Sequence, residues 1–157
     1  MKYRIETKEP FQVIGRTRNM TEANEFWHDI GDMWNQWNSA CMTQKVGEKY
    51  SKEPLGYHFD VSLPTPIASD PKAFTYTIGC MYNGAKNEDN YDIVTMPGGK
   101  YAIFDIPEQY KDDVGEFMGK IIEYLQTEGY ERAGVDVEYF KTVEWEEGKW
   151  EAWELIK

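Results

Sequence analysis

The sequence is poor in cysteine and histidine, with two residues of each among its 157. Cys41 and Cys80 are too few for a disulfide framework and have no CxxC spacing, so we expect both to be reduced structural thiols. His28 and His58 lie far apart and belong to no HExxH pattern. We therefore expect neither a bound metal ion nor a cofactor.

Basic residues and long apolar runs are also scarce. The chain has 17 Lys and Arg against 28 Asp and Glu, a formal charge of −11 that repels phosphate backbones and argues against nucleic-acid binding. No apolar run approaches the roughly 20 residues that span a membrane, and residues 1–6 lack the apolar core of a signal peptide. We expect a cytoplasmic protein with one domain, residues 1–157.

The usual motifs of phosphate binding and nucleophilic catalysis are missing. Gly98-Gly99 lacks the spacing of a phosphate-binding loop and is better explained by a turn. No G-x-S-x-G motif is present to place a nucleophilic serine at a strand-to-helix turn. Nucleotide binding and serine hydrolysis are therefore disfavoured.

Aromatic residues are abundant. Six Trp, eleven Tyr and seven Phe make up 15% of the chain, more than a core of this size needs. Some of these rings are expected to line a pocket, although they could equally fill the core or an oligomer interface.

The chain contains an internal repeat. The alternation Tyr-x-Ile-x-Thr occurs at residues 3–7 and again 88 positions later. A turn follows each copy, with Pro10 in the first and Pro97-Gly98-Gly99 in the second, and then another alternating run, which predicts a hairpin in each half. The runs are residues 3–7 and 11–16 in the first half, and 91–95 and 101–106 in the second.

A helix is predicted after each hairpin. The first covers residues 21–40, with a capping box of Asn19 and Glu22 and apolar residues at helical spacing. The second covers residues 108–128, where one face is apolar and Gly129 ends the helix. The apolar positions are Phe26, Ile30, Met33 and Trp37 in the first helix, and Val114, Phe117, Met118, Ile121, Ile122 and Leu125 in the second.

Each half ends in two more strand-like runs. They are residues 56–63 and 73–82 in the first half, and 135–143 and 149–156 in the second. The order ββαββ, twice, predicts an α+β fold of two pseudo-symmetric halves, residues 1–83 and 91–157. Antiparallel sheets would carry helices on one side and a concave ligand groove on the other. Residues 42–55 and 64–72 are predicted as mobile loops.

One carboxylate lies on a predicted sheet face among aromatic residues. In the strand at residues 135–140, Val135, Val137 and Tyr139 share one face, and Glu138 shares the other with its neighbours two positions away. Those neighbours are Asp136 and Phe140. If the second face lines the groove, Glu138 is a candidate binding residue; otherwise it is one of many solvated acids.

Four features together resemble the GyrI-like (gyrase-inhibitor-like) effector-binding domains. They are the doubled ββαββ order, the Pro-Gly-Gly-Lys-Tyr-Ala-Ile-Phe segment at residues 97–104, the strand Val137-Glu138-Tyr139-Phe140 and the ending Glu-Ala-Trp-Glu-Leu-Ile at residues 151–156. The likeness covers essentially the whole chain. Such domains occur behind DNA-binding modules in AraC-type and other multidrug-sensing transcription regulators, and also as stand-alone proteins. No DNA-binding module fits before Met1, so we expect a stand-alone member.

The resemblance implies a set of pocket residues. The family's pocket glutamate lies in a Phe-Glu-x-Tyr-like strand that maps onto Glu138, with Val137 and Phe140 in place of the usual aromatic residue and tyrosine. Trp153 matches the aromatic residue of the closing strand, although Leu155 stands where proline is common. The expected pocket residues are Glu138, Tyr76, Phe140 and Trp153, with Tyr57, Trp34 and Trp145 as further candidates.

The resemblance also implies a function. A desolvated Glu138 would prefer a lipophilic, cationic and aromatic small molecule, since each surrounding ring adds roughly 0.5 to 2 kcal/mol of cation–π attraction. Two alternatives stay open. Some members of the family hydrolyse strained electrophilic natural products, which would make Glu138 a general base assisted by Tyr76. The acidic charge also fits an inhibitor of a DNA-binding enzyme, so a protein partner or a homodimer is left open.

Overall fold

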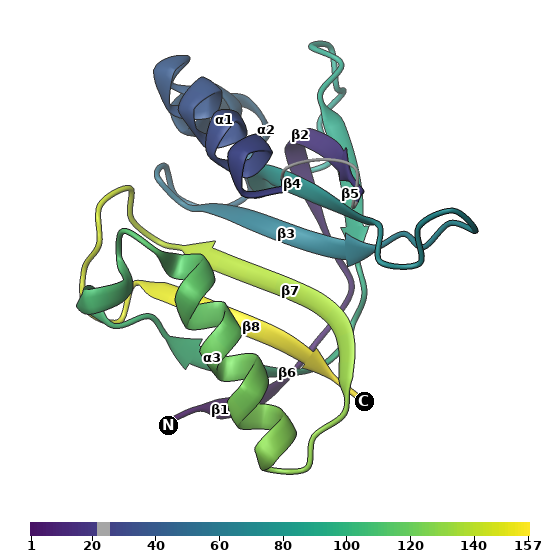
Figure 1. The fold of residues 1–157 in the computed structure, drawn as a ribbon. Coiled ribbons are helices and arrows are strands. Elements are labelled where there is room, and N and C mark those ends of the chain that lie inside the picture. The colour runs from purple at the N-terminus through teal and green to yellow at the C-terminus, as the bar shows by residue number, and fades with distance from the viewer. Residues whose placement is uncertain (22–25) are drawn as a thin grey trace.

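The computed structural model describes residues 1–21 and 26–157, and within them it contains eight strands, three α-helices and one 3₁₀ helix. Helices and strands alternate in groups along the chain (Figure 1). No helix in these ranges is long and apolar enough to cross a membrane. The elements are β1 Arg4–Lys8, β2 Phe11–Met20, α1 Phe26–Ser39, α2 Met42–Tyr50, β3 His58–Pro64, β4 Phe74–Met81, β5 Asp92–Met96, β6 Gly99–Asp105, η1 Glu108–Tyr110, α3 Val114–Thr127, β7 Arg132–Phe140 and β8 Trp150–Ile156.

All eight strands form one antiparallel sheet in the order β1-β6-β8-β7-β3-β4-β2-β5. The antiparallel α+β fold predicted from the sequence is therefore confirmed. The central pair, β3 and β7, comes from different halves of the chain, and Figure 1 shows these two strands side by side across the middle of the molecule.

The two predicted opening hairpins are wrong. β1 pairs with β6, and β5 pairs with β2. The first strand of each half therefore pairs with the second strand of the other half. A two-residue hairpin favours positive φ at one or both turn residues, which Pro10 and Pro97 cannot adopt. The two connections instead pass close to each other: a Cβ on Gly98 would lie 2.8 Å from Cδ of Pro10 and 2.9 Å from the carbonyl oxygen of Lys8. Glycine is required at this crossing.

The predicted loop at residues 42–55 is also wrong in its first part, because residues Met42–Tyr50 form α2. Val46 and Tyr50 are fully buried, and both pack with Cys80 of β4. Cys41, with φ of 54°, separates α2 from α1. The many polar residues of the segment hid an apolar face at i, i+4 and i+8.

The predicted helices differ from the observed ones mainly at their N-termini. Of the proposed capping box, Glu22 lies outside the described residues and Asn19 belongs to β2, where it pairs with Thr75. The second predicted helix is divided into η1 and α3. Its main part begins after Asp113, whose carboxylate accepts a hydrogen bond from the backbone N–H of Glu116 at 3.1 Å. Asp113 is therefore the N-cap.

The helices cover one face of the sheet in two separate places. α1 and α2 pack on β2 and β4, and α3 packs on β6, β7 and β8. Two apolar clusters result, and neither extends across β3. The strand residues of the first cluster are Ile14, Met20, Tyr76, Ile78 and Cys80; those of the second are Ala102, Phe104, Phe140, Ala152 and Ile156.

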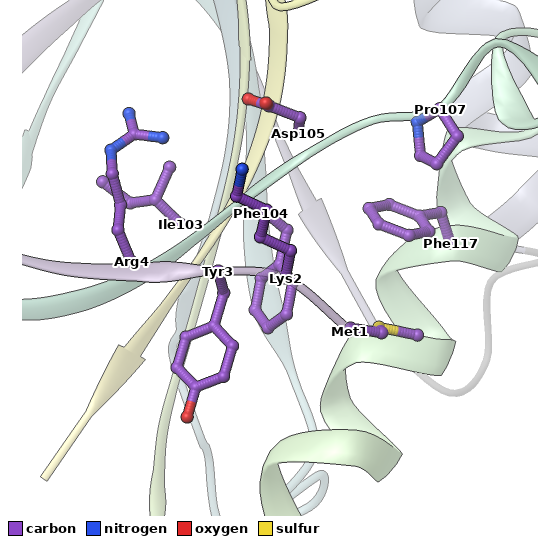
Figure 2. A pocket seen from close by; sticks show the side chains of 9 residues that line it. All are labelled: Met1, Lys2, Tyr3, Arg4, Ile103, Phe104, Asp105, Pro107 and Phe117. Atoms are coloured by element: carbon purple, nitrogen blue, oxygen red, sulfur yellow. The ribbon is translucent and has the colours of Figure 1, made fainter.

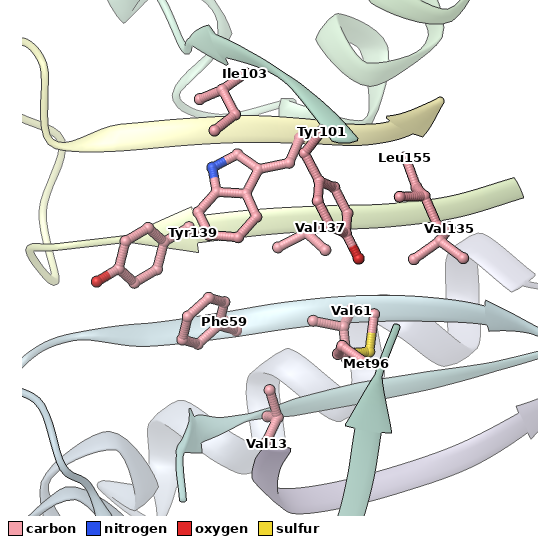
Figure 3. Close-up of a cluster of buried hydrophobic side chains, with 11 residues drawn as sticks. Val13, Phe59, Val61, Met96, Tyr101, Ile103, Val135, Val137, Tyr139 and Leu155 are labelled. Atoms are coloured by element: carbon pink, nitrogen blue, oxygen red, sulfur yellow. The ribbon is translucent and has the colours of Figure 1, made fainter. Parts of the chain in front are cut away.

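The other face of the sheet forms a third cluster that contains no helix residue among those described (Figure 3). Val13 and Met96, from strands at one end of the sheet, share this cluster with Tyr101 and Trp153, from strands near the other end. The sheet therefore curves around it. This face is a packed core, which leaves the helix-bearing face to provide a cavity.

Candidate functional site

A cavity of about 1190 Å³ opens between α1 and the start of α3. The sequence predicts a groove opposite the helices, whereas this cavity lies on the helix-bearing face. The physical reason is the spacing of the helices: α1 and α2 cover one part of the sheet, α3 covers another, and β3 lies between them with the adjoining part of β7 (Figure 1). Side chains of these central strands form the cavity floor.

Three rows of cross-strand neighbours on β3, β7 and β8 underlie the cavity, and the floor is formed by their β3 and β7 members together with Trp150 of β8. The strand register places Asp60 directly opposite Glu138 in the middle row. Ala152, the next residue of that row, is fully buried in the cluster beneath α3 and does not line the cavity. The three rows are Asp60–Glu138–Ala152, Ser62–Asp136–Glu154 and His58–Phe140–Trp150.

The middle row holds a pair of carboxyl groups. Asp60 is 4% exposed and Glu138 is half-buried. Burial raises the pKa of Glu138 to about 7; the hydrogen bond with Asp60 opposes this shift, and the charges of Asp136 and Asp113 add to it. Burial and the charge of Glu138 raise the pKa of Asp60 well above its usual range. The pair therefore retains a proton at neutral pH.

Tyr76 connects this pair to α1. Its hydroxyl accepts a hydrogen bond from Nε1 of Trp34 at 2.8 Å and also interacts with the Asp60 carboxyl group. The Tyr76 side chain is 5% exposed, and burial raises the pKa of its hydroxyl well above the usual value. The hydroxyl is therefore neutral and orients both Trp34 and Asp60.

Phe140 lies at the centre of an aromatic wall beside the carboxyl pair. His58 stacks on it with 4.9 Å between ring centroids, and Trp34 meets it edge-on at 5.9 Å. Trp150 makes a third contact, also edge-on, at 4.9 Å. Burial lowers the pKa of His58, and its Nδ1 donates to the carbonyl of Gly56 at 2.7 Å, so this ring is neutral. The wall thus offers ring faces and edges without positive charge.

The Ser62–Asp136–Glu154 row carries its own cation, Arg132. Nε of Arg132 lies 2.6 Å from Glu154, and Nη2 lies 3.0 Å from Asp136. Burial, and then the hydrogen bond and charge of Asp136, raise the pKa of Glu154 to about 10, although the adjacent Arg132 acts to lower it. Since Glu154 is protonated at neutral pH, Asp136 is the carboxylate that compensates the Arg132 charge within this row. Across residues 1–21 and 26–157, no group of three His, Cys, Asp or Glu side chains is arranged to hold a metal ion.

Four of the seven residues expected in the pocket line this cavity: Glu138, Tyr76, Phe140 and Trp34. The predicted alternation of residues 135–140 between two faces is confirmed, because residues 135, 137 and 139 belong to the opposite core.

The other three expected residues lie elsewhere. Trp153 packs in the core of the opposite face and donates from Nε1 to Glu151. Tyr57 contacts Tyr139 on that same face, with 6.0 Å between ring centroids. Trp145 donates from Nε1 to the carbonyl oxygen of Ile106 at 2.9 Å and does not line the cavity. Trp153 is on the wrong face because alternation along β8 places Ala152, not its neighbour, beside Glu138.

Sequence reasoning missed Asp60, His58 and Trp150 as cavity residues, and it placed Asp136 only as a neighbour of Glu138 on the same face. A signal for Asp60 was present, because His58, Asp60 and Ser62 alternate with Phe59 and Val61 in a predicted strand. The alternation indicates a polar face. It does not reveal that this face continues onto β7, since the pairing of β3 with β7 joins residues far apart in sequence.

A second cavity, of about 400 Å³, lies between the N-terminal residues, β6 and α3 (Figure 2). Tyr3 stacks on Phe104 in its wall, with 5.1 Å between centroids. The charged residues that line it are Lys2, Arg4 and Asp105. It has no buried carboxyl pair, so the larger cavity is the candidate site.

Comparison with solved structures supports the same fold. SAV2435, in a structure bound to tetraphenylphosphonium, has a TM-score of 0.79 and 15% identity over 100% of this chain and 94% of that chain. An integron cassette protein, VCH_CASS2, from the mobile metagenome of Vibrio cholerae has a TM-score of 0.70 and 16% identity over 99% and 95%. The EcmrR C-terminal domain has a TM-score of 0.52 and 12% identity over 100% and 99%. A search of curated proteins gave no match.

A protein family described as "Cass2: Integron-associated effector binding protein" matches residues 4–153, nearly the whole chain. This match confirms the resemblance to effector-binding domains inferred from the sequence. The chain belongs to the Cass2 family of integron-associated effector binding proteins.

Proposed function

We propose that the protein binds a lipophilic organic cation in the cavity between α1 and α3, in an effector-sensing or sequestering role. The observation that carries this proposal is the Asp60–Glu138 pair, a negatively charged group beside the aromatic wall around Phe140. A desolvated negative charge favours a positive ligand, and aromatic rings attract organic cations.

The size of the cavity and one structural relative support this choice. Ligand pockets commonly measure roughly 300 to 1,000 Å³, and this cavity of about 1190 Å³ is large enough for a bulky ligand. SAV2435 was solved with tetraphenylphosphonium, a cation whose charge is surrounded by four phenyl rings. We assign Glu138 as the anionic anchor, Phe140 and Trp34 as ring contacts, and Tyr76 as the residue that orients Trp34 and Asp60.

We also infer that residues 1–83 and 91–157 are copies of one structural unit. The sheet order supports this inference, because it reads the same from either end once β1 to β4 are exchanged with β5 to β8. Under that exchange β3 and β7 are equivalent, and their register makes Asp60 the counterpart of Glu138. The carboxyl pair would then lie on the axis that relates the two halves.

A fluorescence titration tests the proposal. Trp34 and Trp150 lie in the cavity, so bound tetraphenylphosphonium is expected to change the tryptophan emission. Glu138→Gln should weaken the binding by about 1.5–3 kcal/mol, the cost of losing a charged interaction, whereas binding of the neutral triphenylphosphine oxide should change less. Glu123→Gln, on the exposed side of α3, serves as the matched control. Equal losses for both ligands would show that shape alone is recognised, and no emission change with any cation would refute the proposal.

Hydrolysis of a strained electrophile is a second candidate, favoured by one observation. The pKa of Glu138, about 7, suits a general base at neutral pH. Tyr76 is a poor proton donor, however, because its hydroxyl is buried and already engaged with Trp34 and Asp60. Multiple turnovers of an epoxide or aziridine substrate that disappear in Glu138→Gln would establish the enzyme. Consumption at the rate of buffer alone would exclude it for that substrate.

A further inference from the structure

The Asp60–Glu138 pair has a geometry that forces two acids to share one region of the cavity. Directly opposed residues on antiparallel strands have Cβ atoms about 4.5–5.5 Å apart. Both side chains line the same cavity, and Asp60 is only 4% exposed to solvent. Two full negative charges at this separation repel strongly in a buried site.

Among the described residues, the charged neighbours that shift the pKa values of Asp60 and Glu138 include no Lys or Arg. The charges that act most strongly on Glu138 are those of Asp136 and Asp113, both negative. Arg132 is bonded to Glu154 and Asp136, and the cavity-lining residues of α1 contain no ionisable side chain. The other ionisable residues around the cavity, element by element, are His58 of β3, Tyr76 of β4, Lys72 before β4, and Lys111, Asp112 and Asp113 before α3.

A single proton held between the two carboxyl groups relieves the repulsion and leaves one net negative charge. We propose that an organic cation entering the cavity displaces this proton, so that the site exchanges one cation for one proton and its total charge stays constant. The proton passes to solvent, and the pair becomes doubly ionised against the bound cation. This inference rests on the proposed function, and it assigns Asp60 as a second residue that determines the selectivity of the site.

The exchange links affinity to pH. Above the Glu138 pKa of about 7 the pair holds only the shared proton, so each cation bound releases about one proton and the affinity rises about tenfold per pH unit. The affinity stops rising where the free pair loses its last proton. Above the Glu138 pKa of about 7, we expect Asp60 to retain the shared proton, because burial and the charge of Glu138 raise the pKa of Asp60 well above its usual range.

Isothermal titration calorimetry measures the released proton directly. Tetraphenylphosphonium is titrated into the protein at pH 8 in phosphate and in Tris, whose ionisation enthalpies differ, so the difference in heat gives the number of protons released. The wild type should release about one proton per cation. In Asp60→Asn the amide can still donate to Glu138 but has no proton that titrates near pH 8, so the expected release is about zero.

Each outcome separates the inference from the function on which it rests. Binding by the wild type without proton release would overturn the exchange and leave cation binding intact. Equal release by the wild type and Asp60→Asn would place the proton elsewhere and also overturn it. No heat and no fluorescence change with the cation would overturn both proposals. A pH series of the wild type alone gives an independent reading should Asp60→Asn fold poorly: an affinity that stays flat below pH 8 would contradict the exchange.

Discussion

Glu138→Gln is expected to stabilise the ligand-free protein above neutral pH. Burial raises the pKa of Glu138 from its ordinary 4.5 to about 7. Between these two values the carboxyl group is ionised in the unfolded chain but protonated in the folded protein. The folded state then binds more protons, so the free energy of unfolding falls as the pH rises. The penalty is absent below about pH 4.5 and fully developed above about pH 7.

The structure bounds the size of this effect. The pKa difference is 7 minus 4.5, about 2.5 units, which at 1.36 kcal/mol per unit gives an upper bound of about 3.4 kcal/mol. Glu138 is half-buried in a cavity that opens to solvent, so we expect Glu138→Gln to gain about 1–3 kcal/mol at pH 8. Loss of the Glu138 charge also lowers the pKa of Asp60, which acts in the same direction.

Urea unfolding followed by tryptophan fluorescence measures this gain. The wild type and Glu138→Gln are compared at pH 4.5 and pH 8, with Glu123→Gln as an exposed control. The difference between wild type and Glu138→Gln should be small at pH 4.5 and favour the variant at pH 8, while the control stays flat. A difference that does not change with pH, or a wild type that is more stable at pH 8, would show that burial does not perturb this carboxyl group.

Three further predictions concern packing and the aromatic wall. Gly15→Ala would place a Cβ 1.9 Å from the carbonyl oxygen of Ile78, so we expect a loss of about 3 kcal/mol or more, seen as a large fall in the urea midpoint. Val46→Ala should cost about 2 kcal/mol by the same assay if α2 is part of the core, whereas a loop residue would cost less than about 0.5. Trp34→Phe removes the hydrogen bond to Tyr76, at a cost of about 1 kcal/mol, and should reduce the fluorescence response to tetraphenylphosphonium more than Trp153→Phe does.

Local patterns in the sequence predicted the local structure well. Alternation placed Glu138 on the face opposite Val137 and Tyr139, because successive side chains of a strand point to opposite faces. The apolar stripe of residues 114–125 predicted α3, since its positions recur at helical spacing. Both signals depend only on neighbours within a few residues.

Long-range pairing could not be read in this way. No local signal indicates that β1, which ends at Lys8, pairs with β6 of the other half rather than with β2. The opening hairpins were therefore predicted incorrectly. The same limit hid Asp60, whose importance comes from its register opposite Glu138. The prediction of Trp153 as a pocket residue was wrong for a different reason. The family resemblance located the correct strand, but neighbouring residues of a strand point to opposite faces of the sheet, and Trp153 points into the core.

The position of the carboxyl pair explains how the fold tolerates it. A buried acid pair inside either helix-covered cluster would replace apolar packing and leave charges without solvent. Asp60 and Glu138 instead lie between the part of the sheet that α1 and α2 cover and the part that α3 covers, where both line the cavity. Neither carboxyl group of this junction belongs to the apolar cluster on either side. It follows that the side chains of the junction can change, and ligand preference with them, at a smaller cost in stability than equivalent changes at Ile78 or Phe104.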